Sequence, residues 1–235
     1  YQMLYPSHVK DVIETVLLIS SSDGYINICA IDPTGKNGLI SRTFNVSKEF
    51  LDCLDFVCAH NKKLNIHFSV NALIAPISRK PKKSDVKLVT FAHVDIDPDP
   101  QIIKTEGIGA AKKVLHDRAQ TIIKQYKPTL IIWSGNGLQL FWAHNTPLSI
   151  SEGESNNRML IEVFGGDKGT QSADRLMRLG GTTNHPTSVK IAKGYSPDPT
   201  QSEILHLSPD DTYDASLFPT IAIDSPVTVI PFPQA

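Results

Sequence analysis

Two aspartates near the middle of the chain have the spacing of a metal-binding pair. Asp95 and Asp97 stand two residues apart, directly after an apolar run. In a β-strand, residues i and i+2 point to the same face, so these carboxylates would lie side by side while Val94 and Ile96 face the other way. Adjacent carboxylates repel each other, and a divalent cation such as Mg²⁺ or Mn²⁺ is the usual remedy. An isolated pair of this kind is more often two solvated acids where a strand enters an Asp-Pro turn, so the other motifs must decide.

The second motif is a glycine-rich turn between two apolar stretches. Its residues are Ser134, Gly135, Asn136 and Gly137. Glycines permit a tight turn and close approach of the backbone to a ligand, although Asn-Gly also suits an ordinary type I′ hairpin. The structural explanation leaves Gln139 unexplained, because this polar residue interrupts the second apolar stretch. Its amide can donate and accept hydrogen bonds, so it could contact a nucleotide or occupy the wetter face of the strand.

The third motif, at 165–184, combines acids, arginines and glycines. Asp167 is a candidate third metal ligand. Arg175 and Arg178 are three residues apart, so they could share one helical face and grip phosphates in bidentate fashion. The backbone N–H groups of 180–182 could face the same phosphates. Alternatively, Asp174 and Arg175 form surface ion pairs and the glycines form a loop.

Taken together and in this order, the three motifs resemble the archaeo-eukaryotic primase superfamily, and most of all the RepB-like primase and primase–polymerase domains of phages and plasmids. Those domains carry an h-D-h-D-P strand, a Ser-Gly-x-Gly hairpin with His or Gln in its second strand, and a G-G-D…D-R-[IL]-[ML]-R-L-P-G-T-x-N block. The corresponding segments are 94–98, 134–142 and 165–184. Gln139 stands where many members have His, and Gly180 stands where the pattern has Pro.

The resemblance implies a two-metal site that binds Mg²⁺ or Mn²⁺. Asp95, Asp97 and Asp167 would be its catalytic ligands, with Asp174 as the alternative third ligand. The residues implied at the nucleotide are Ser134, Gly135, Asn136, Gly137, Gln139, Arg175 and Arg178. Lys190 and Lys193 are weaker candidates for contacts with phosphate or template.

The activity that the resemblance implies is DNA-templated nucleotidyl transfer. A primase or primase–polymerase of this kind makes primers on single-stranded DNA during phage, plasmid or mobile-element replication. The partners would be a single-stranded DNA template, NTP or dNTP, and a replicative helicase in the same or another chain, with no membrane contact. Two other functions stay open: a non-catalytic single-stranded-DNA- or origin-binding replication domain, and a metal-dependent nuclease.

The bulk composition is that of an ordinary globular protein. The 235 residues are 40% hydrophobic and 20% charged, and the net charge of −1 favours neither nucleic-acid nor membrane binding. Basic residues nevertheless cluster, and each cluster is either a solvated loop or a phosphate-contacting surface. The first cluster contains Arg79, Lys80, Lys82, Lys83 and Lys87, and the second contains Arg175, Arg178, Lys190 and Lys193.

The cysteines and the chain start bear on location. None of the three cysteines has C-x-x-C spacing, and Cys53 and Cys58 are expected to be small buried hydrophobes. A reducing compartment fits. The sequence shows no signal peptide or long apolar span, so we expect a cytoplasmic protein, and the resemblance implies that a bacterium, phage or plasmid encodes it. The chain opens at Tyr1 and not Met, which predicts a domain of a longer protein.

Hydrophobic periodicity predicts strands interleaved with helices. Strands are expected at 25–31, 64–73, 86–97, 129–133 and 138–142. Helices are expected at 109–126, at 154–164 and from the N-cap candidate Ser47 onward, while 9–18 is a short helix or the start of a strand. A turn is expected at 32–38 and a basic loop at 76–84.

This order of elements indicates an α+β fold: an RRM-like antiparallel sheet with flanking helices plus an N-terminal α/β module, with the resemblance implying a primase-type catalytic core. The open face of an RRM-like sheet is a recurrent nucleic-acid platform. We expect a catalytic domain at 1–207, divided into a module at about 1–85 and a metal-binding core at about 86–207. Residues 208–235 are expected to be a strand or linker tail that leads to further domains.

Overall fold

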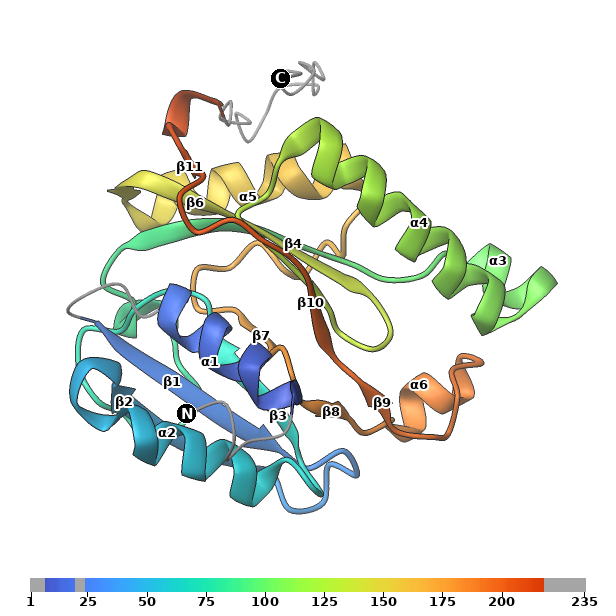
Figure 1. The fold of residues 1–235 in the computed structure, drawn as a ribbon, viewed down its shortest axis with the longest axis horizontal. Helices are drawn as coiled ribbons and strands as arrows, with labels where there is room; N and C mark the ends of the chain where they lie inside the picture. Colours follow the sequence, from blue (N-terminus) through green and yellow to red (C-terminus); the bar gives the residue numbers. More distant parts are fainter. Residues whose placement is uncertain (1–6, 20–23, 218–235) are drawn as a thin grey trace.

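The computed structural model of this protein describes residues 7–19 and 24–217. Two sheets lie face to face between layers of helices (Figure 1). The α-helices are α1 (Ser7–Ile19), α2 (Val46–His60), α3 (Pro100–Glu106), α4 (Ile108–Tyr126), α5 (Ile150–Phe164) and α6 (Ser188–Ala192), with 3₁₀ turns η1 (Lys83–Asp85) and η2 (Ala215–Leu217). The strands are β1 (Tyr25–Ile31), β2 (Leu39–Asn45), β3 (Asn65–Ser69), β4 (Val89–Ile96), β5 (Leu130–Trp133), β6 (Leu138–Leu148), β7 (Leu176–Arg178), β8 (Thr183–Asn184), β9 (Thr200–Gln201), β10 (Glu203–Leu207) and β11 (Thr212–Tyr213).

The first sheet has the order β2-β1-β3-β7, and all its pairs are antiparallel. The predicted turn at 32–38 joins β1 to β2. The Asp32 carboxylate accepts the backbone N–H groups of Thr34 and Asn37, each at 2.9 Å, and these bonds lower the pKa of Asp32 to about 2. Strand β7 joins this sheet from the later half of the chain, with Arg178 opposite His67.

The second sheet has β6 at its centre, with β5 and then β10 on one side and β4 on the other. Side chains alternate along β4 as the sequence predicts. Val94 and Ile96 pack in the core beneath α4 and α5, whereas Phe91 packs in the core that the two sheets share. Asp95 has the same parity as Phe91, so its side chain is on the face that looks toward the first sheet.

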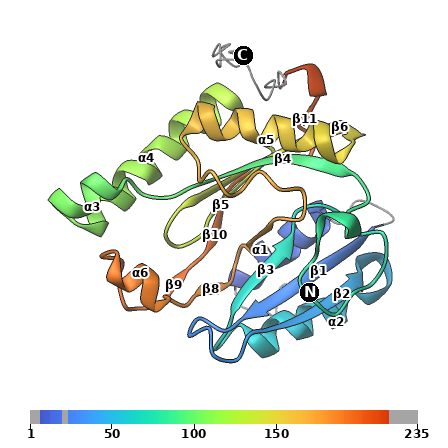
Figure 2. The same ribbon diagram turned by 180° about the vertical axis from the view of Figure 1, so that it is seen from behind.

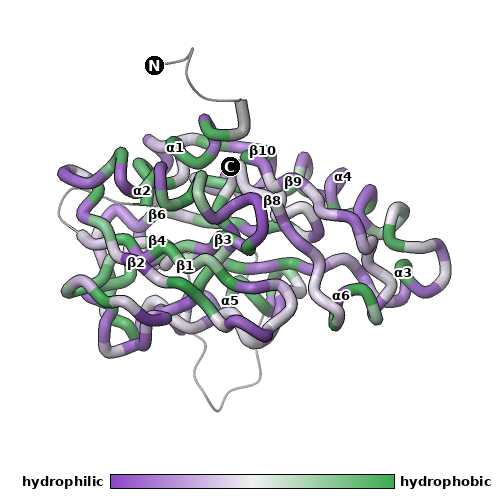
Figure 3. The backbone as a smooth tube through the Cα atoms, turned by 90° about the horizontal axis from the view of Figure 1, so that it is seen from below, coloured by the Kyte–Doolittle hydropathy of each residue, from purple (hydrophilic) through white to green (hydrophobic). Residues whose placement is uncertain are grey.

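The layers share two large apolar cores. Phe68 of β3 and Phe141 of β6 meet across the inter-sheet core with ring centroids 6.0 Å apart. Helix α2 covers the outer face of the first sheet, and α4 and α5 cover the outer face of the second (Figure 2). Hydrophobic stretches gather where the strands cross the middle of the molecule, whereas α3, α4 and α6 reach one end of it (Figure 3). The predicted α+β class with an antiparallel sheet is confirmed.

Helix starts differ from the predictions because caps decide them. Helix α5 begins at Ile150 and not at 154, since Ser149 forms a capping box with Glu152. The prediction of Ser47 as the N-cap of α2 is wrong: the N-cap is Asn45, and the Ser47 hydroxyl donates to the Asn45 side chain at 2.6 Å. The segment 9–18 is helical, within α1.

Other predicted elements need correction. Strand β3 stops at Ser69, β6 continues to Leu148, and α3 was not expected at all. Cys53 is buried, and burial raises the pKa of its thiol to about 12, but Cys58 is exposed, contrary to the expectation of a buried hydrophobe.

Residues 208–217 return to the second sheet. Strand β11 pairs with β6 in parallel, with Thr212 opposite Ala143. The rest of the predicted tail, 218–235, lies outside the described residues, and the domain division stays a prediction. No helix among the described residues is long and apolar enough to cross a membrane.

Candidate active site

A cleft of about 210 Å³ lies between the two sheets, where β4 ends. Residues of all three sequence motifs line it, together with several that the sequence did not single out. The lining residues are Asn65, His67, Asp95, Asp97, Ser134, Asn136, Gln139, Arg178, Asn184, His185, Pro186, Thr187 and Lys190. The fold therefore brings Asp95 and Asp97 together with the hairpin turn, Gln139, one of the two arginines and one lysine of the second basic cluster.

Asp95 lies in an environment that disfavours its negative charge. Burial raises the pKa of its carboxyl group to about 7, and the nearby charges of Asp97 and Asp167 act in the same direction. The positive charges of Arg175 and Lys190 oppose that rise only in part. A carboxyl group with such a pKa has too little positive charge around it, which is the electrostatic setting that an added cation would correct.

Asp97 is more exposed and already has a cationic partner. The Lys190 ammonium nitrogen lies 2.9 Å from each of the two Asp97 carboxylate oxygens. The same nitrogen lies 4.7 Å from the centroid of the Tyr195 ring, a cation–π geometry. Both oxygens of Asp97 are thus engaged by one cation of the protein.

Asp167 lies beside the pair, but its side chain does not line the cleft. Its backbone N–H donates to the Asp95 carbonyl oxygen at 2.9 Å, while its exposed carboxylate accepts the Gly169 N–H at 3.2 Å. Gly166 makes this approach possible, since a Cβ there would lie 2.3 Å from Val94 Cγ2. Within 7–19 and 24–217, no three His, Cys, Asp or Glu side chains form a group that could hold a metal ion.

Asp174 and Arg175 also lie outside the cleft lining. The Ser172 hydroxyl donates to the Asp174 carboxylate, and the Arg175 guanidinium reaches the Gly169 carbonyl at 3.4 Å. Arg175 still lowers the pKa of Asp95 through its charge. The roles of Asp167, Asp174 and Arg175 therefore stay predictions.

A buried pair anchors the loop that carries Asp167. Asn157 of α5 accepts the His93 backbone N–H at 2.8 Å and donates to the Gln171 carbonyl at 3.1 Å. The His93 ring lies 2.9 Å from the Thr170 carbonyl, and burial lowers the pKa of His93 to about 4. His93 is thus a neutral core residue that fixes the loop against β4.

The turn at 134–137 packs tightly on the end of β4. The Ser134 hydroxyl accepts the Gly137 N–H at 2.9 Å, which closes the turn. A Cβ at Gly137 would lie 2.6 Å from the Ile96 carbonyl oxygen and 3.5 Å from the Asp97 carboxylate. Gly135 has φ +87, and a Cβ there would lie 2.4 Å from the Thr200 hydroxyl. Both glycines are therefore required by geometry at the edge of the cleft.

Gln139 is a buried polar group aimed into the cleft. It lies opposite Asp95 in the β4–β6 register and is 4% exposed. Its carbonyl oxygen Oε1 has no hydrogen-bond partner among the described residues. A buried acceptor in this state is costly, and it matches the oxygen ligands that Mg²⁺ and Mn²⁺ take. Asp95, Asp97 and Gln139 therefore offer the cleft oxygen donors of the type that a divalent cation takes.

Arg178 is buried and connects the first sheet to β8. Its guanidinium donates to Asn65 at 2.9 Å, to Asn184 at 3.0 Å and to the Thr183 carbonyl at 3.3 Å. Asn184 in turn donates to the Ser134 carbonyl at 2.7 Å. The expectation that Arg175 and Arg178 share a helical face is wrong, because 176–178 is strand β7, paired with β3.

One further expectation is wrong in this region, and one lining residue was not predicted. The N–H groups of Gly181 and Thr182 bond to the Ser202 carbonyl and hydroxyl at 3.2 and 3.0 Å, so they do not face a phosphate. His67 was given no role, yet it lines the cleft opposite Arg178. Burial first, and then the charge of Arg178, hold the pKa of His67 far below its ordinary range. Its polar position in an apolar strand was the one available signal.

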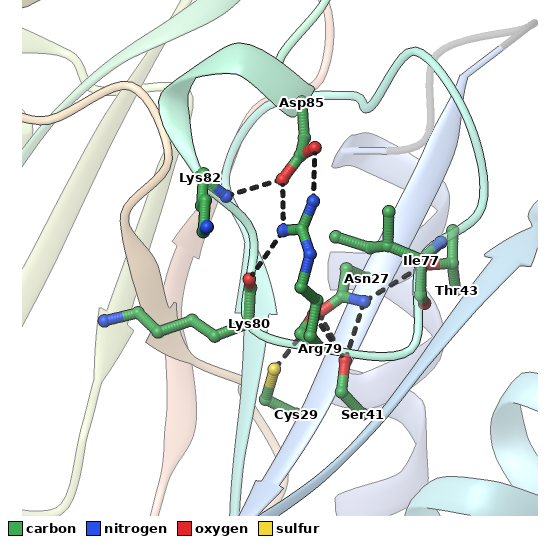
Figure 4. A network of polar contacts seen from close by, with 9 residues as sticks. All are labelled: Asn27, Cys29, Ser41, Thr43, Ile77, Arg79, Lys80, Lys82 and Asp85. Atoms are coloured by element: carbon green, nitrogen blue, oxygen red, sulfur yellow. Dashed lines mark hydrogen bonds and ion pairs between the residues drawn. The ribbon is translucent and has the colours of Figure 1, made fainter.

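The first basic cluster is held in a fixed loop (Figure 4). Arg79 makes two hydrogen bonds to the Asp85 carboxylate, at 2.6 and 2.9 Å, and its carbonyl oxygen accepts the Ser41 hydroxyl at 2.9 Å. Lys83 pairs with buried Glu154 of α5 at 2.8 Å. Lys80 and Lys82 are exposed. Nucleic-acid contact by this cluster stays a prediction, and Arg79 and Lys83 would bring charges that are already paired.

Comparison with known proteins bears on the fold that carries this site. No protein-family model matches the sequence, and no curated protein matches it. Among solved structures, the AEP domain of the cyanophage S-2L primase-polymerase (PrimPol) aligns with 89% of this chain and 95% of its own length, at TM-score 0.57 and 13% identity. Primase RepB′ aligns with 87% of this chain at TM-score 0.55 and 11% identity, and this chain spans 58% of its length. The catalytic domain of primase RepB′ in complex with initiator DNA aligns with 88% of both chains at TM-score 0.56 and 11% identity. The chain has the fold of archaeo-eukaryotic primase catalytic domains.

Proposed function

We propose that this domain is a DNA-templated nucleotidyltransferase, a primase or primase–polymerase that makes primers in phage, plasmid or mobile-element replication. The observation that carries the proposal is the placement of Asp95, Asp97 and the Gln139 carbonyl oxygen, which has no hydrogen-bond partner among residues 7–19 and 24–217, in one cleft. Arg178 and Lys190 supply positive charge at the same cleft. The fold shared with primase and primase-polymerase domains supports this reading.

In this proposal Asp95 and Asp97 hold Mg²⁺ or Mn²⁺, with Asp167 or, as the alternative, Asp174 as third ligand. Two ions bound there would activate a 3′-hydroxyl and stabilise the leaving pyrophosphate. The protein itself contributes position and charge. The turn 134–137 lets the backbone approach the nucleotide, Gln139 orients it, and Arg175 and Arg178 add positive potential.

The proposed ligands are single-stranded DNA and NTP or dNTP. A DNA-bound primase among the structures of similar fold supports the first. The proposed template path uses the exposed charges of Lys80, Lys82 and Lys193, with Arg79 and Lys83 beside it. We also propose the catalytic extent as 1–207, a helicase as partner, and a cytoplasmic setting.

The test is incorporation of labelled NTP or dNTP on a single-stranded DNA template with Mg²⁺ or Mn²⁺. We expect extension products from the wild type. The double variant Asp95→Asn with Asp97→Asn should lose at least about 100-fold of that activity, because it removes the charges that face the cation. Asp52→Asn with Asp55→Asn makes the same charge change on the exposed face of α2 and serves as the control. A wild type that incorporates nothing under any of these conditions would sink the proposal.

Two observations favour a second candidate, a non-catalytic DNA-binding domain. Lys190 already neutralises Asp97, and no three-carboxylate group is present in the described part of the chain. A binder of this kind would hold single-stranded DNA equally well in EDTA and would extend no primer. Cleavage of labelled DNA without extension would instead indicate a nuclease.

A further inference from the structure

The segment 185–199 is a loop between β8 and β9, and its tip, which contains α6 and Lys190, contacts Asp97. Strands β8 and β9 pair at its base, with Thr183 opposite Gln201 and Asn184 opposite Thr200. The loop carries α6 and lies near α3 (Figures 1 and 2). Gly194 of the loop approaches Ile103 of α3. The loop thus forms one wall of the cleft and faces the end of β4, which carries the acids.

The tip is shaped around Lys190. Its backbone N–H donates to the Thr187 hydroxyl at 3.3 Å, and its carbonyl oxygen accepts the N–H groups of Lys193 and Tyr195 at 3.0 and 3.2 Å. These bonds bring the Tyr195 ring under the Lys190 ammonium group. The local backbone therefore presents this one ammonium group to Asp97.

The contact between Lys190 and Asp97 imitates a bound cation. The ammonium nitrogen is equidistant from both carboxylate oxygens, at 2.9 Å. The nearby Gln139 carbonyl oxygen, 4% exposed by residue, lines the same cleft and has no partner among the described residues. Of the oxygen donors that a cation would use, those of Asp97 are thus already paired with Lys190, whereas the Gln139 carbonyl oxygen has no partner among the described residues.

The Lys190 contact is weak enough to be exchanged. The Lys190 side chain is 34% exposed and that of Asp97 is 49% exposed, and ion pairs this open to water contribute at most about 1 kcal/mol. Helix α6 has no buried residue, and its residue Val189 is 62% exposed. Few packing contacts oppose a shift of this tip.

We propose that Lys190 is an exchangeable counter-ion of Asp97, which a divalent cation displaces on binding and which then pairs with the polyphosphate of the incoming nucleotide. The inference rests on the proposed function only in that the cleft takes a cation and a nucleotide. In the protein without ligand, Lys190 would neutralise Asp97 and compete with free metal for it. Metal and nucleotide would bind more readily together than metal alone, because the nucleotide offers Lys190 a new partner. Its net effect on metal binding is therefore opposite to its effect on nucleotide binding.

The test uses Mn²⁺ binding, followed by the electron paramagnetic resonance signal of free Mn²⁺, and nucleotide binding in the presence of saturating Mn²⁺. Lys190→Met should bind Mn²⁺ roughly two- to tenfold more tightly than wild type without nucleotide, since the competing ion pair is gone. The same variant should bind nucleotide more weakly. Lys190→Arg retains the charge and should stay near wild type in both assays. Lys124→Met on α4 is the exposed control.

Opposite signs in the two assays separate exchange from a structural role, which would weaken both. Lys190→Met that binds Mn²⁺ no more tightly than wild type overturns the inference, whether or not primers are made. Absence of Mn²⁺ binding in both proteins overturns it as well. Tighter Mn²⁺ binding by Lys190→Met, together with no primer synthesis by the wild type, would support the exchange and reject the proposed function alone.

Discussion

Gln139 lies directly opposite Asp95 across the β4–β6 pair, and the two side chains look into the same cleft. One is a carboxyl group whose pKa burial raises to about 7, and the other carries an acceptor oxygen without a partner in the described structure. Both are costly for the folded chain by itself. Such costs are typical of sites built for a ligand that relieves them.

We predict that Gln139→Met stabilises the protein without ligand and weakens Mn²⁺ binding. Removing a buried unsatisfied acceptor should raise the free energy of unfolding by about 1 kcal/mol, because methionine fills a similar volume without a polar group. Urea unfolding measures the first effect and Mn²⁺ titration the second. A variant that is less stable than wild type and binds Mn²⁺ normally would contradict the assigned role of Gln139.

Gly137→Ala should damage the site through sterics. The new Cβ would lie 2.6 Å from the Ile96 carbonyl oxygen, so either the turn or the end of β4 must move. We expect a loss of about 1–3 kcal/mol in unfolding free energy and a larger loss of nucleotide binding. Gly109→Ala is the matched control, because a Cβ at Gly109 meets nothing within 4 Å and the residue lies in α4. That control should be slightly more stable than wild type.

Arg178→Met should uncouple the two sheets. The change removes the Arg178 donor from the Asn184 side-chain oxygen and one of the two donors from the Asn65 side-chain oxygen, which keeps the His185 N–H, so we expect the unfolding free energy to fall by about 2–4 kcal/mol. Arg178→Lys should rescue little, because one ammonium group cannot reproduce the planar fork. Thermal unfolding with Arg158→Met, on a partly exposed arginine, gives the comparison. Equal losses in Arg178→Met and Arg158→Met would show that the connection contributes nothing special.

The free energy of unfolding should decrease as the pH falls, because His144 is buried in its neutral form. Burial lowers the pKa of this β6 residue to about 4, below its ordinary value of 6.5. Between these values the unfolded chain binds a proton that the folded chain does not, so the stability is complete above pH 6.5 and is lost as the pH falls toward 4. The loss should be about 3 kcal/mol, from a difference of about 2.5 pKa units.

Urea unfolding at several pH values checks this prediction. His144→Gln should flatten the slope between pH 6.5 and 4, whereas His116→Gln, at an exposed position on α4, serves as the control. An unchanged slope in His144→Gln would assign the pH effect to other buried histidines, such as His67 and His93.

Local signals were sufficient for several elements of the fold. The alternation of β4, the Ser134–Gly137 turn and the periodicity of α4 each depend on neighbours in sequence, and each was predicted. Helix α3 could also have been found, because Asp99 and Pro100 are an N-cap and an N1 residue.

Contacts between residues that are distant in the sequence could not be predicted from it. Arg178 is in a strand only because β3 pairs with it, and the amides of Gly181 and Thr182 are used by Ser202. Lys190 reaches Asp97 across the cleft from a segment with no strong pattern of its own. A propensity argument weighs near neighbours, and it cannot see which remote partner claims a side chain.

Arg178 has a mechanical consequence. Asn65, Arg178, Asn184 and Ser134 are linked in series, from the edge of the first sheet to the turn that borders Asp97. Sliding of one sheet over the other would stretch this chain of bonds and tilt the turn with it. The width of the cleft is therefore coupled to the relative position of the two sheets, so that a displacement of the first sheet would move the Ser134–Gly137 turn beside Asp97.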